Sequence, residues 1–270
     1  MERRNEMHRI RSSQRDLWRS FIVFRGFRCA APWAKSVRSP RELEHSQLTF
    51  EVVTLRSRMV PDSWFADKDS QREVEQLCDT ARGCYARGWV PATSGNFSIR
   101  SGDRVFITAS GLNKGKLTPE DLLEIDMSGE VIGGKGRPSA ETKLHLVIYR
   151  ERPNAGAILH VHSVSNTLLS GKFEDEGFVA LRGYELLKGL AGVATHEHVE
   201  RVPIIANTQE YASLAEKLRG ALQENSEAHG VLLSRHGLYT WGESVAEARR
   251  HLEALEFLFE VEGRRVFGGI

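Results

Sequence analysis

The regular part of the sequence begins near residue 69, where apolar and small residues recur every three or four positions. In DSQREVEQLCDTARGCYARGW (residues 69–89) these positions are filled by Val74, Leu77, Cys78, Ala81 and Tyr85. This spacing places the five side chains on one face of a helix. Gly88 is typical of the residue that ends such a helix, so the segment is predicted to be the first helix.

The next segment, GNFSIRSGDRVFITASG (residues 95–111), changes to the alternation that is typical of strands. Phe97 and Ile99 alternate with Ser98 and Arg100, SGD supplies a turn, and VFIT runs back. This pattern predicts an antiparallel hairpin.

LTPEDLLEID (residues 117–126) predicts a short helix that follows the hairpin. Thr118 is expected as its N-cap and Pro119 at its first position. From residue 127 to residue 266 helical and strand-like segments continue to alternate, without a strict strand–helix–strand rhythm. We therefore expect an α/β layered domain with a largely antiparallel sheet, and one domain over residues 59–270.

The first 58 residues differ from the rest of the chain. They are rich in Arg and Ser and carry no sustained period. Their composition resembles a transit peptide, but Glu2, Glu6 and Asp16 break the acid-poor pattern of such peptides. We expect a poorly ordered N-terminal extension over residues 1–58, with Met59 as the natural start.

Composition and charge weigh against several classes of function. The 270 residues carry a net charge of +1 and no basic run interleaved with aromatic residues, so a nucleic-acid partner is not expected. No apolar stretch approaches the roughly 20 residues that cross a bilayer, so no membrane partner is expected. Cys29, Cys78 and Cys84 are too few for a disulfide framework, which favours a reducing compartment. We expect a cytoplasmic protein.

Two histidines, His160 and His162, come at the end of the apolar run AILHVHS (residues 157–163). Residues i and i+2 of a strand point to the same side, so both rings can reach one metal ion. The ordinary alternative is two unrelated polar residues where a strand meets a loop.

A third histidine, His236, follows an apolar run in VLLSRHGLYTWG (residues 231–242). Three imidazoles with an open position are typical of catalytic zinc, although other divalent ions accept the same set. His196 and His198 in THEHVE have the same spacing and form an alternative pair. We prefer His160 and His162, because an apolar strand can hold its ligands rigidly.

Two carboxylates are candidates for moving protons beside a metal. Glu141 follows Ser139, a plausible N-cap, and is expected in the first turn of a helix whose free amides can hold an anion. Glu185 in GYELLKGL is the second candidate. Their ordinary interpretations are an acid that stabilises a helix dipole and a solvated helix residue.

Small polar residues in two loops can cradle phosphate with their amides and hydroxyls. They are Gly95 and Asn96 in ATSGN, and Ser110 and Gly111 in TASGL.

Taken in order, TSGNFSIR, ITASG, PSAET, HVH and SRHG are similar to the class II aldolase family, whose members are zinc enzymes acting on sugar phosphates. The resemblance covers roughly residues 69–263. Within the family, GWVPATSGNFS, YELLKG, PIIANTQ and RHGLYTWGE look most like a branch that dehydrates a methylthio-substituted ketose phosphate in methionine salvage.

The resemblance implies a three-layer α/β/α fold and a homotetramer with its sites near subunit contacts. It implies one Zn²⁺ per chain, bound by His160, His162 and His236. It places the family's helix-start acid on Glu141 and the dehydratase acid/base on Glu185. Phosphate would be held by residues drawn from Ser94, Gly95, Asn96, Ser110, Gly111 and Ser139. Ala140 replaces a small residue, often Ser, of the aldolase phosphate loop.

Two other functions stay open on the same residues. An aldolase or epimerase could act on another ketose phosphate, with Glu141 handling the proton. A non-catalytic module is the second alternative, because adducin head domains resemble this family.

Overall fold

The computed structural model describes residues 68–268. The expected extension over residues 1–58 and the expected start at Met59 lie outside the described residues, as does Cys29. Nothing below concerns them.

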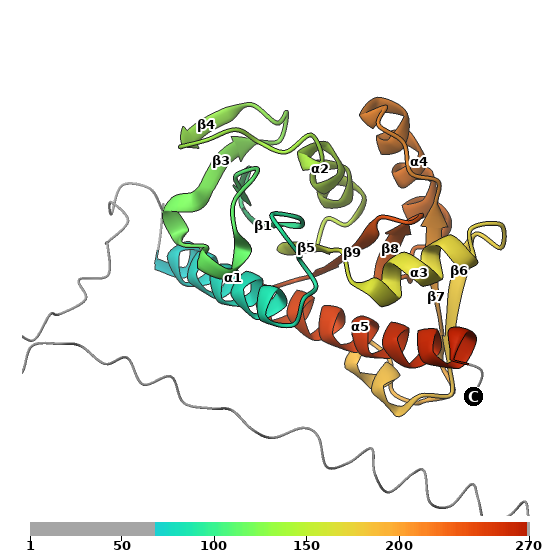
Figure 1. Cartoon of the computed structure of the whole chain (residues 1–270). Coiled ribbons are helices and arrows are strands. Elements are labelled where there is room, and N and C mark those ends of the chain that lie inside the picture. The colour runs from blue at the N-terminus through green and yellow to red at the C-terminus, as the bar shows by residue number, and fades with distance from the viewer. Residues whose placement is uncertain (1–67, 269–270) are drawn as a thin grey trace, which may run out of the picture. The chain divides into compact units, whose positions relative to one another are not determined.

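Five α-helices and nine strands make up the described part of the chain (Figure 1). The helices are α1 Lys68–Ala86, α2 Thr142–Glu151, α3 Val164–Lys172, α4 Tyr211–Glu224 and α5 Val245–Phe267. The strands are β1 Asn96–Ser101, β2 Arg104–Thr108, β3 Leu122–Asp126, β4 Val131–Gly134, β5 Ala157–Val161, β6 Phe178–Arg182, β7 Val199–Ile205, β8 Gly230–Leu233 and β9 Gly237–Gly242. Three short 3-10 turns are η1 Lys114–Lys116, η2 Pro119–Asp121 and η3 Glu185–Gly189.

All nine strands form one sheet in the order β4-β3-β2-β1-β5-β9-β8-β7-β6. Within the described residues, β7 and β8 are the one parallel pair and every other neighbour is antiparallel. The expected hairpin is β1 and β2, joined at the predicted turn. The sheet is therefore largely antiparallel, as the sequence predicts.

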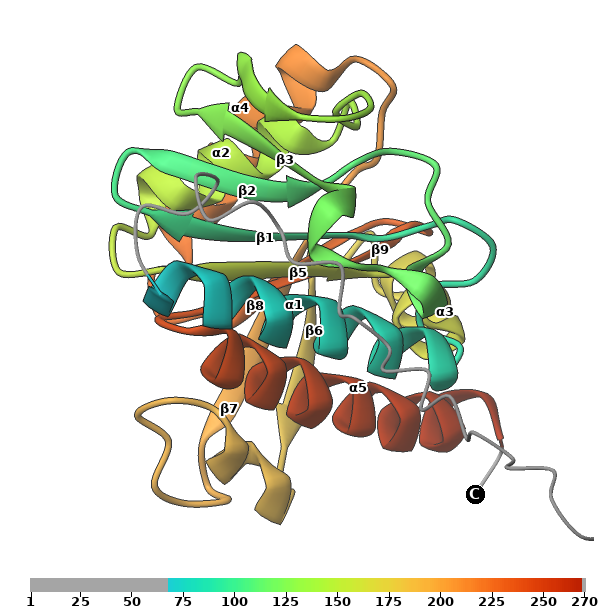
Figure 2. The same cartoon turned by 90° about the vertical axis from the view of Figure 1, so that its left-hand side faces the viewer.

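Helices cover both faces of this sheet (Figures 1 and 2). Alternation along the strands sends one set of side chains, such as Phe97 and Leu159, into a core with α1, α3 and α5. The opposite set, such as Ile158 and Tyr239, packs into a second core with α2 and α4. Burial of apolar area in the two cores drives the layering, and the expected three-layer α/β/α fold is confirmed.

The prediction of a short helix over residues 117–126 is wrong for residues 122–126, which form a strand. Only the turn η2 forms before it, and Leu122 begins strand β3, which pairs with β2. The helix-start features are present, since the main-chain N–H of Thr118 donates to Asp121 Oδ2 at 2.9 Å. The chain turns into a strand because Leu122 and Leu123 bury on opposite faces of the sheet, and no helix presents consecutive residues in that way.

Within residues 68–268 no helix is both long enough and apolar enough to cross a membrane.

Candidate metal centre and substrate cavity

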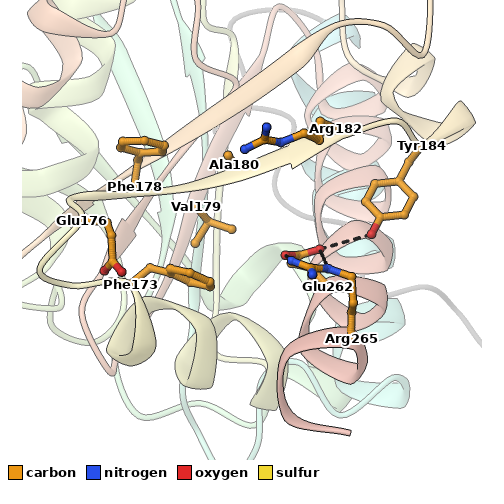
Figure 3. A pocket seen from close by; sticks show the side chains of 9 residues that line it. All are labelled: Phe173, Glu176, Phe178, Val179, Ala180, Arg182, Tyr184, Glu262 and Arg265. Atoms are coloured by element: carbon orange, nitrogen blue, oxygen red, sulfur yellow. Dashed lines mark hydrogen bonds and ion pairs between the residues drawn. The ribbon is translucent and has the colours of Figure 1, made fainter. Parts of the chain in front are cut away.

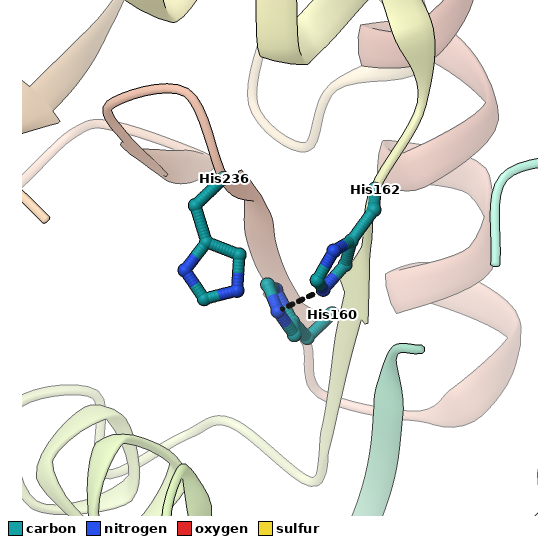
Figure 4. Close-up of side chains that lie close together, drawn as sticks. All are labelled: His160, His162 and His236. Carbon is teal, nitrogen blue, oxygen red and sulfur yellow. Dashed lines mark hydrogen bonds between the residues drawn. The ribbon is translucent and has the colours of Figure 1, made fainter. Parts of the chain in front are cut away.

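His160, His162 and His236 converge where strand β5 ends and strand β9 begins (Figure 4). One ring nitrogen from each of them lies within 4.8 Å of the other two. The Nε2 atoms of His160 and His162 are 2.8 Å apart, and the ring centres of His162 and His236 are 4.7 Å apart. No other group of three or more His, Cys, Asp or Glu with such geometry occurs in residues 68–268.

The sheet topology explains why residues more than seventy positions apart meet here. β5 and β9 are antiparallel neighbours with Val161 opposite Leu238, so the end of β5 adjoins the start of β9. His236 lies in the tight turn between β8 and β9, where Arg235 adopts a left-handed conformation with φ 54°. Gly237 permits the close approach, because a Cβ there would lie 2.3 Å from the carbonyl oxygen of Val161.

The protonation of His160 suits a metal ligand. Its Nδ1 lies 2.9 Å from the carbonyl oxygen of Leu238 and donates to it, which leaves the Nε2 lone pair directed at the other two rings. Burial lowers the pKa of His160 well below its usual range and lowers that of His162 to about 4. Both rings are therefore neutral near pH 7, as metal coordination requires.

Glu141 closes the space beside the three rings. It is the N-cap residue of α2, so the helix begins at Thr142, two positions later than an N-cap at Ser139 would place it. Its Oε1 lies 3.0 Å from Nε2 of His236, and its Oε2 lies 3.7 Å from Nε2 of His160. Burial opposes the charge of this carboxyl, but the hydrogen bonds from His236 and Asn96 help to outweigh burial, and its pKa lies well below its usual range.

A buried chain of hydrogen bonds orients Glu141. Nδ2 of Asn96 donates to its Oε2 at 2.5 Å, and Oδ1 of Asn96 accepts from Nε2 of His145 at 2.5 Å. Nδ1 of His145 then accepts from the hydroxyl of Ser98 at 2.7 Å, which in turn lies 2.8 Å from the Tyr149 hydroxyl. Each donor in this chain points toward Glu141, so the network favours the carboxylate form.

A cavity of about 180 Å³ adjoins the metal centre. The six residues that the sequence suggests for phosphate all line it: Ser94, Gly95, Asn96, Ser110, Gly111 and Ser139. Glu141 and His162 line it too, so the loops and the metal centre share one space. Within the described residues the buried hydroxyl of Ser94 has no hydrogen-bond partner, and it is free to bind a ligand.

Sequence reasoning missed Lys114, which also lines the cavity. Its side chain is buried, and Nζ donates to the carbonyl oxygens of Thr93 at 3.1 Å and Leu112 at 3.0 Å, which ties the two small-residue loops together. Burial lowers the pKa of Lys114 to about 8, against a smaller opposing effect of Glu141. Since an ammonium group has three donors, one remains for an anion. LNKGK has no periodicity or spacing that could have marked this lysine.

Sequence reasoning also missed two tyrosines, because no periodicity or spacing marked them. Tyr211, at the start of α4, lines the cavity. Tyr239 of β9 is fully buried and stacks on the ring of His160 with the ring centres 3.9 Å apart. Tyr239 thereby fixes the plane of one candidate ligand.

Glu185 is the one predicted site residue that belongs neither to this cavity nor to the group of three histidines. It begins η3, in the connection between β6 and β7, with its side chain 72% exposed. It pairs with Lys188, and its Oε2 lies 3.6 Å from Nδ1 of His196. Glu185 therefore does not face the metal centre of its own chain.

The alternative pair His196 and His198 is divided between two acids. His196 approaches Glu185, whereas Nε2 of His198 lies 2.9 Å from Oε2 of Glu200. The described structure gathers the third histidine, His236, with His160 and His162 instead.

Comparison with known proteins agrees with this geometry. Residues 75–262 match the family model for the Class II Aldolase and Adducin N-terminal domain. The chain belongs to the class II aldolase family. The family expected from the motifs is thus confirmed, and the match spans every residue of the metal centre and the cavity.

Among the curated members of this family, the chain is similar to proteins named methylthioribulose-1-phosphate dehydratase. The one from Methylococcus capsulatus is 48% identical over 199 residues, which cover 73% of this chain and 96% of that protein. The one from Stenotrophomonas maltophilia is 47% identical over 198 residues, covering 72% and 92%. Among solved structures, L-fuculose-1-phosphate aldolase from Thermus thermophilus superimposes with a TM-score of 0.60 at 27% identity, covering 74% and 98%.

Proposed function

We propose that this class II aldolase family member is a zinc-dependent hydro-lyase that converts 5-methylthioribulose 1-phosphate to 2,3-diketo-5-methylthiopentyl 1-phosphate in methionine salvage. The observation that carries the proposal is the convergence of three imidazoles beside a cavity lined by small polar loop residues. The curated relatives support the choice of substrate, since their names give this dehydratase activity.

Zinc is the proposed metal, one ion per chain, held by His160, His162 and His236. The donor set fits, because it offers one ring nitrogen from each of three histidines, and three nitrogen ligands are typical of a catalytic zinc site. When bound, zinc supplies Lewis-acid polarisation of the substrate ketone, which makes the neighbouring C–H more acidic.

The loops of the cavity would hold the substrate phosphate. Ser94, Ser110 and Ser139 offer hydroxyls, and the glycines Gly95 and Gly111 let the backbone approach closely. Nζ of Lys114 lies between the two loops. Its charge would add a charge-assisted hydrogen bond to the phosphate. This arrangement orients C2, C3 and C4 of the ketose relative to the metal centre.

Glu185 is the proposed acid/base, supplied by a neighbouring subunit of a homotetramer. Its carboxylate takes the C3 proton, and the C4 hydroxyl leaves as water with that proton. The resulting enol then becomes the 2,3-diketone as a proton moves from the C3 hydroxyl to C4. Because Glu185 is exposed and outside the cavity of its own chain, a second copy must bring it to the site.

Single substitutions test the two halves of this proposal. Glu185→Gln should keep zinc and lose turnover by about a hundredfold or more, the usual size of a general acid/base contribution. His160→Ala should lose zinc and activity together. Full turnover in the first variant would remove Glu185 from the role, and full zinc content in the second would favour another metal site.

Hybrid oligomers test the contribution of the second subunit. If Glu185 acts across a subunit contact, co-expressing the His160→Ala and Glu185→Gln chains restores activity in about a quarter of the sites, those that join one intact centre to one intact Glu185. If Glu185 acts within its own chain, every site lacks one group and the mixture stays inactive. Each variant alone is the matched control.

Retro-aldol cleavage is a second candidate, favoured by the position of Glu141. This carboxylate, unlike Glu185, lies beside the three rings in the same chain. Product analysis separates the two reactions, because dehydration conserves the carbon chain whereas cleavage yields two fragments. A zinc content of about one per chain would argue against an adducin-like module without catalysis.

The cytosol is the proposed compartment. Cys78 and Cys84 are buried as free thiols, and burial raises the pKa of each to about 12. They are therefore unreactive packing residues, which is consistent with a reducing environment.

A further inference from the structure

A second cluster of ionisable side chains lies at the opposite end of β8 from the metal centre. His236 follows β8, whereas His229 immediately precedes it. Around His229 lie Glu200 of β7, His198 just before β7, and His251 of α5. The three histidines of this cluster border a cavity of about 650 Å³ that shares no residue with the substrate cavity. The metal centre therefore does not explain this cluster.

His229 is held with both ring nitrogens against acceptors. Nδ1 lies 3.1 Å from Oε2 of Glu200, and Nε2 lies 2.8 Å from the carbonyl oxygen of Ala191. A neutral imidazole has one N–H, so both contacts are hydrogen bonds only in the imidazolium form. Burial opposes that charge, but the hydrogen bond and charge of Glu200 outweigh it and raise the pKa of His229.

Glu200 is a buried carboxylate that depends on this partner. It is 1% exposed, and it accepts from the main-chain N–H of His229 at 2.9 Å and from His198 at 2.9 Å as well. Burial raises the pKa of Glu200, but these hydrogen-bond donors outweigh burial and lower the pKa below its usual range. The His229 ring makes the largest contribution among them. A buried charge that is paired and hydrogen-bonded in this way is costly to disturb.

The peptide group of Ala191 lies between two imidazoles. His229 donates to its carbonyl oxygen, and Nε2 of His251 accepts from its N–H at 3.0 Å. His251 is neutral and fixed, because its Nδ1 donates to a carbonyl oxygen of β9 at 2.7 Å. Ala191 belongs to residues 184–198, which we call the β6–β7 connection.

The β6–β7 connection carries Glu185, the proposed acid/base. At its start the hydroxyl of Tyr184 donates to Oε2 of Glu262 on α5 at 3.2 Å (Figure 3). In its middle Leu187 and Leu190 are buried in the core beside α5. The described contacts of Glu185 are with Lys188 and His196, both in the same connection. The position of Glu185 is therefore set by how the connection docks.

We propose that His229 is a positioning residue for Glu185, which fixes the β6–β7 connection through Ala191 so that Glu185 is presented to the neighbouring subunit. This inference rests on the proposed function. It assigns a role to His198 and His229 that neither the metal centre nor the substrate cavity supplies: His198 and Glu200 hold His229, and His229 holds Ala191.

Two neutral substitutions separate the contacts of His229. The amide nitrogen of Gln occupies the place of Nε2, so His229→Gln retains the donor to Ala191. The amide nitrogen of Asn occupies the place of Nδ1, so His229→Asn retains only the donor to Glu200. Both variants lose the charge, which makes each the control for the other.

The holoenzyme of each variant is assayed for zinc content, KM and kcat with 5-methylthioribulose 1-phosphate. We expect full zinc and unchanged KM in both variants, and a kcat lowered about tenfold or more in His229→Asn alone, because a displacement of about 1 Å can cost a hundredfold. Amide hydrogen exchange of the β6–β7 connection should rise in the same variant and stay low in His229→Gln.

A double variant shows whether His229 acts through Glu185. Adding His229→Asn to Glu185→Gln should cause no further loss, because the positioned group is already absent. Equal losses in the wild-type and Glu185→Gln backgrounds would overturn the inference, as would equal hydrogen exchange in the Asn and Gln variants. Full turnover of Glu185→Gln by itself would instead refute the proposed function, so the two failures are distinguishable.

Discussion

Glu256 on α5 provides a quantitative test of the core beside the metal centre. It is 2% exposed, and its Oε1 accepts from Nδ2 of Asn166 at 2.7 Å. Asn166 and Ser163 form the first turn of α3, directly after His162. Burial raises the pKa of Glu256 from 4.5 to about 7, and the hydrogen bonds from Ser163 and Asn166 only partly offset it.

The sign of the resulting pH dependence follows from the direction of the shift. The folded protein binds this proton more tightly than the unfolded chain, so the stabilisation is complete below the unfolded pKa of 4.5 and is lost as the pH rises through about 7. The difference of about 2.5 pKa units corresponds to about 3 kcal/mol of unfolding free energy. Glu256→Gln keeps an acceptor for Asn166 and cannot ionise.

The assay is denaturant unfolding of the wild type and Glu256→Gln from about pH 4.5 to about pH 8, at equal protein and zinc concentrations. The stability of the variant relative to the wild type should rise by about 3 kcal/mol across this range, because effects of pH on zinc binding cancel in the difference. Glu253→Gln, a half-buried position on the same helix that pairs with Arg87 and Arg249, controls for losing one negative charge. A difference that stays constant with pH would refute the reasoning.

Three further substitutions test the site. Gly237→Ala would place a Cβ 2.3 Å from the carbonyl oxygen of Val161, so it should lower the unfolding free energy by about 3 kcal/mol and reduce zinc content; full zinc by metal analysis would contradict this. Lys114→Met should raise KM about tenfold by removing a charged donor. Because burial lowers the pKa of Lys114 to about 8, the wild-type KM should rise as pH increases through that value, whereas a rise in the Met variant would exclude Lys114 as the cause. Asn96→Ala removes the donor to Oε2 of Glu141 and should cost about 1 to 3 kcal/mol of unfolding free energy; an unchanged denaturation midpoint would argue against the network.

Local patterns in the sequence were sufficient for the fold class and for much of the candidate site. Helical spacing and strand alternation are encoded within a few neighbouring residues, so α1 and the β1–β2 hairpin could be predicted directly. The order of the short motifs pointed to the class II aldolase family, which the family match confirms. The same pattern failed at β3, because pairing with β2 and burial on two faces outweighed a good helix start.

Tertiary structure alone decided which distant groups share a space. The choice between two identical His-x-His spacings depends on β5 lying beside β9, a contact between residues far apart in the chain. Lys114 became a candidate only when folding buried it between two loops, and Glu185 lies away from its expected place because the β6–β7 connection docks on α5. Sequence periodicity records which face of an element is buried, whereas burial, pKa and the neighbours of a side chain arise from long-range packing.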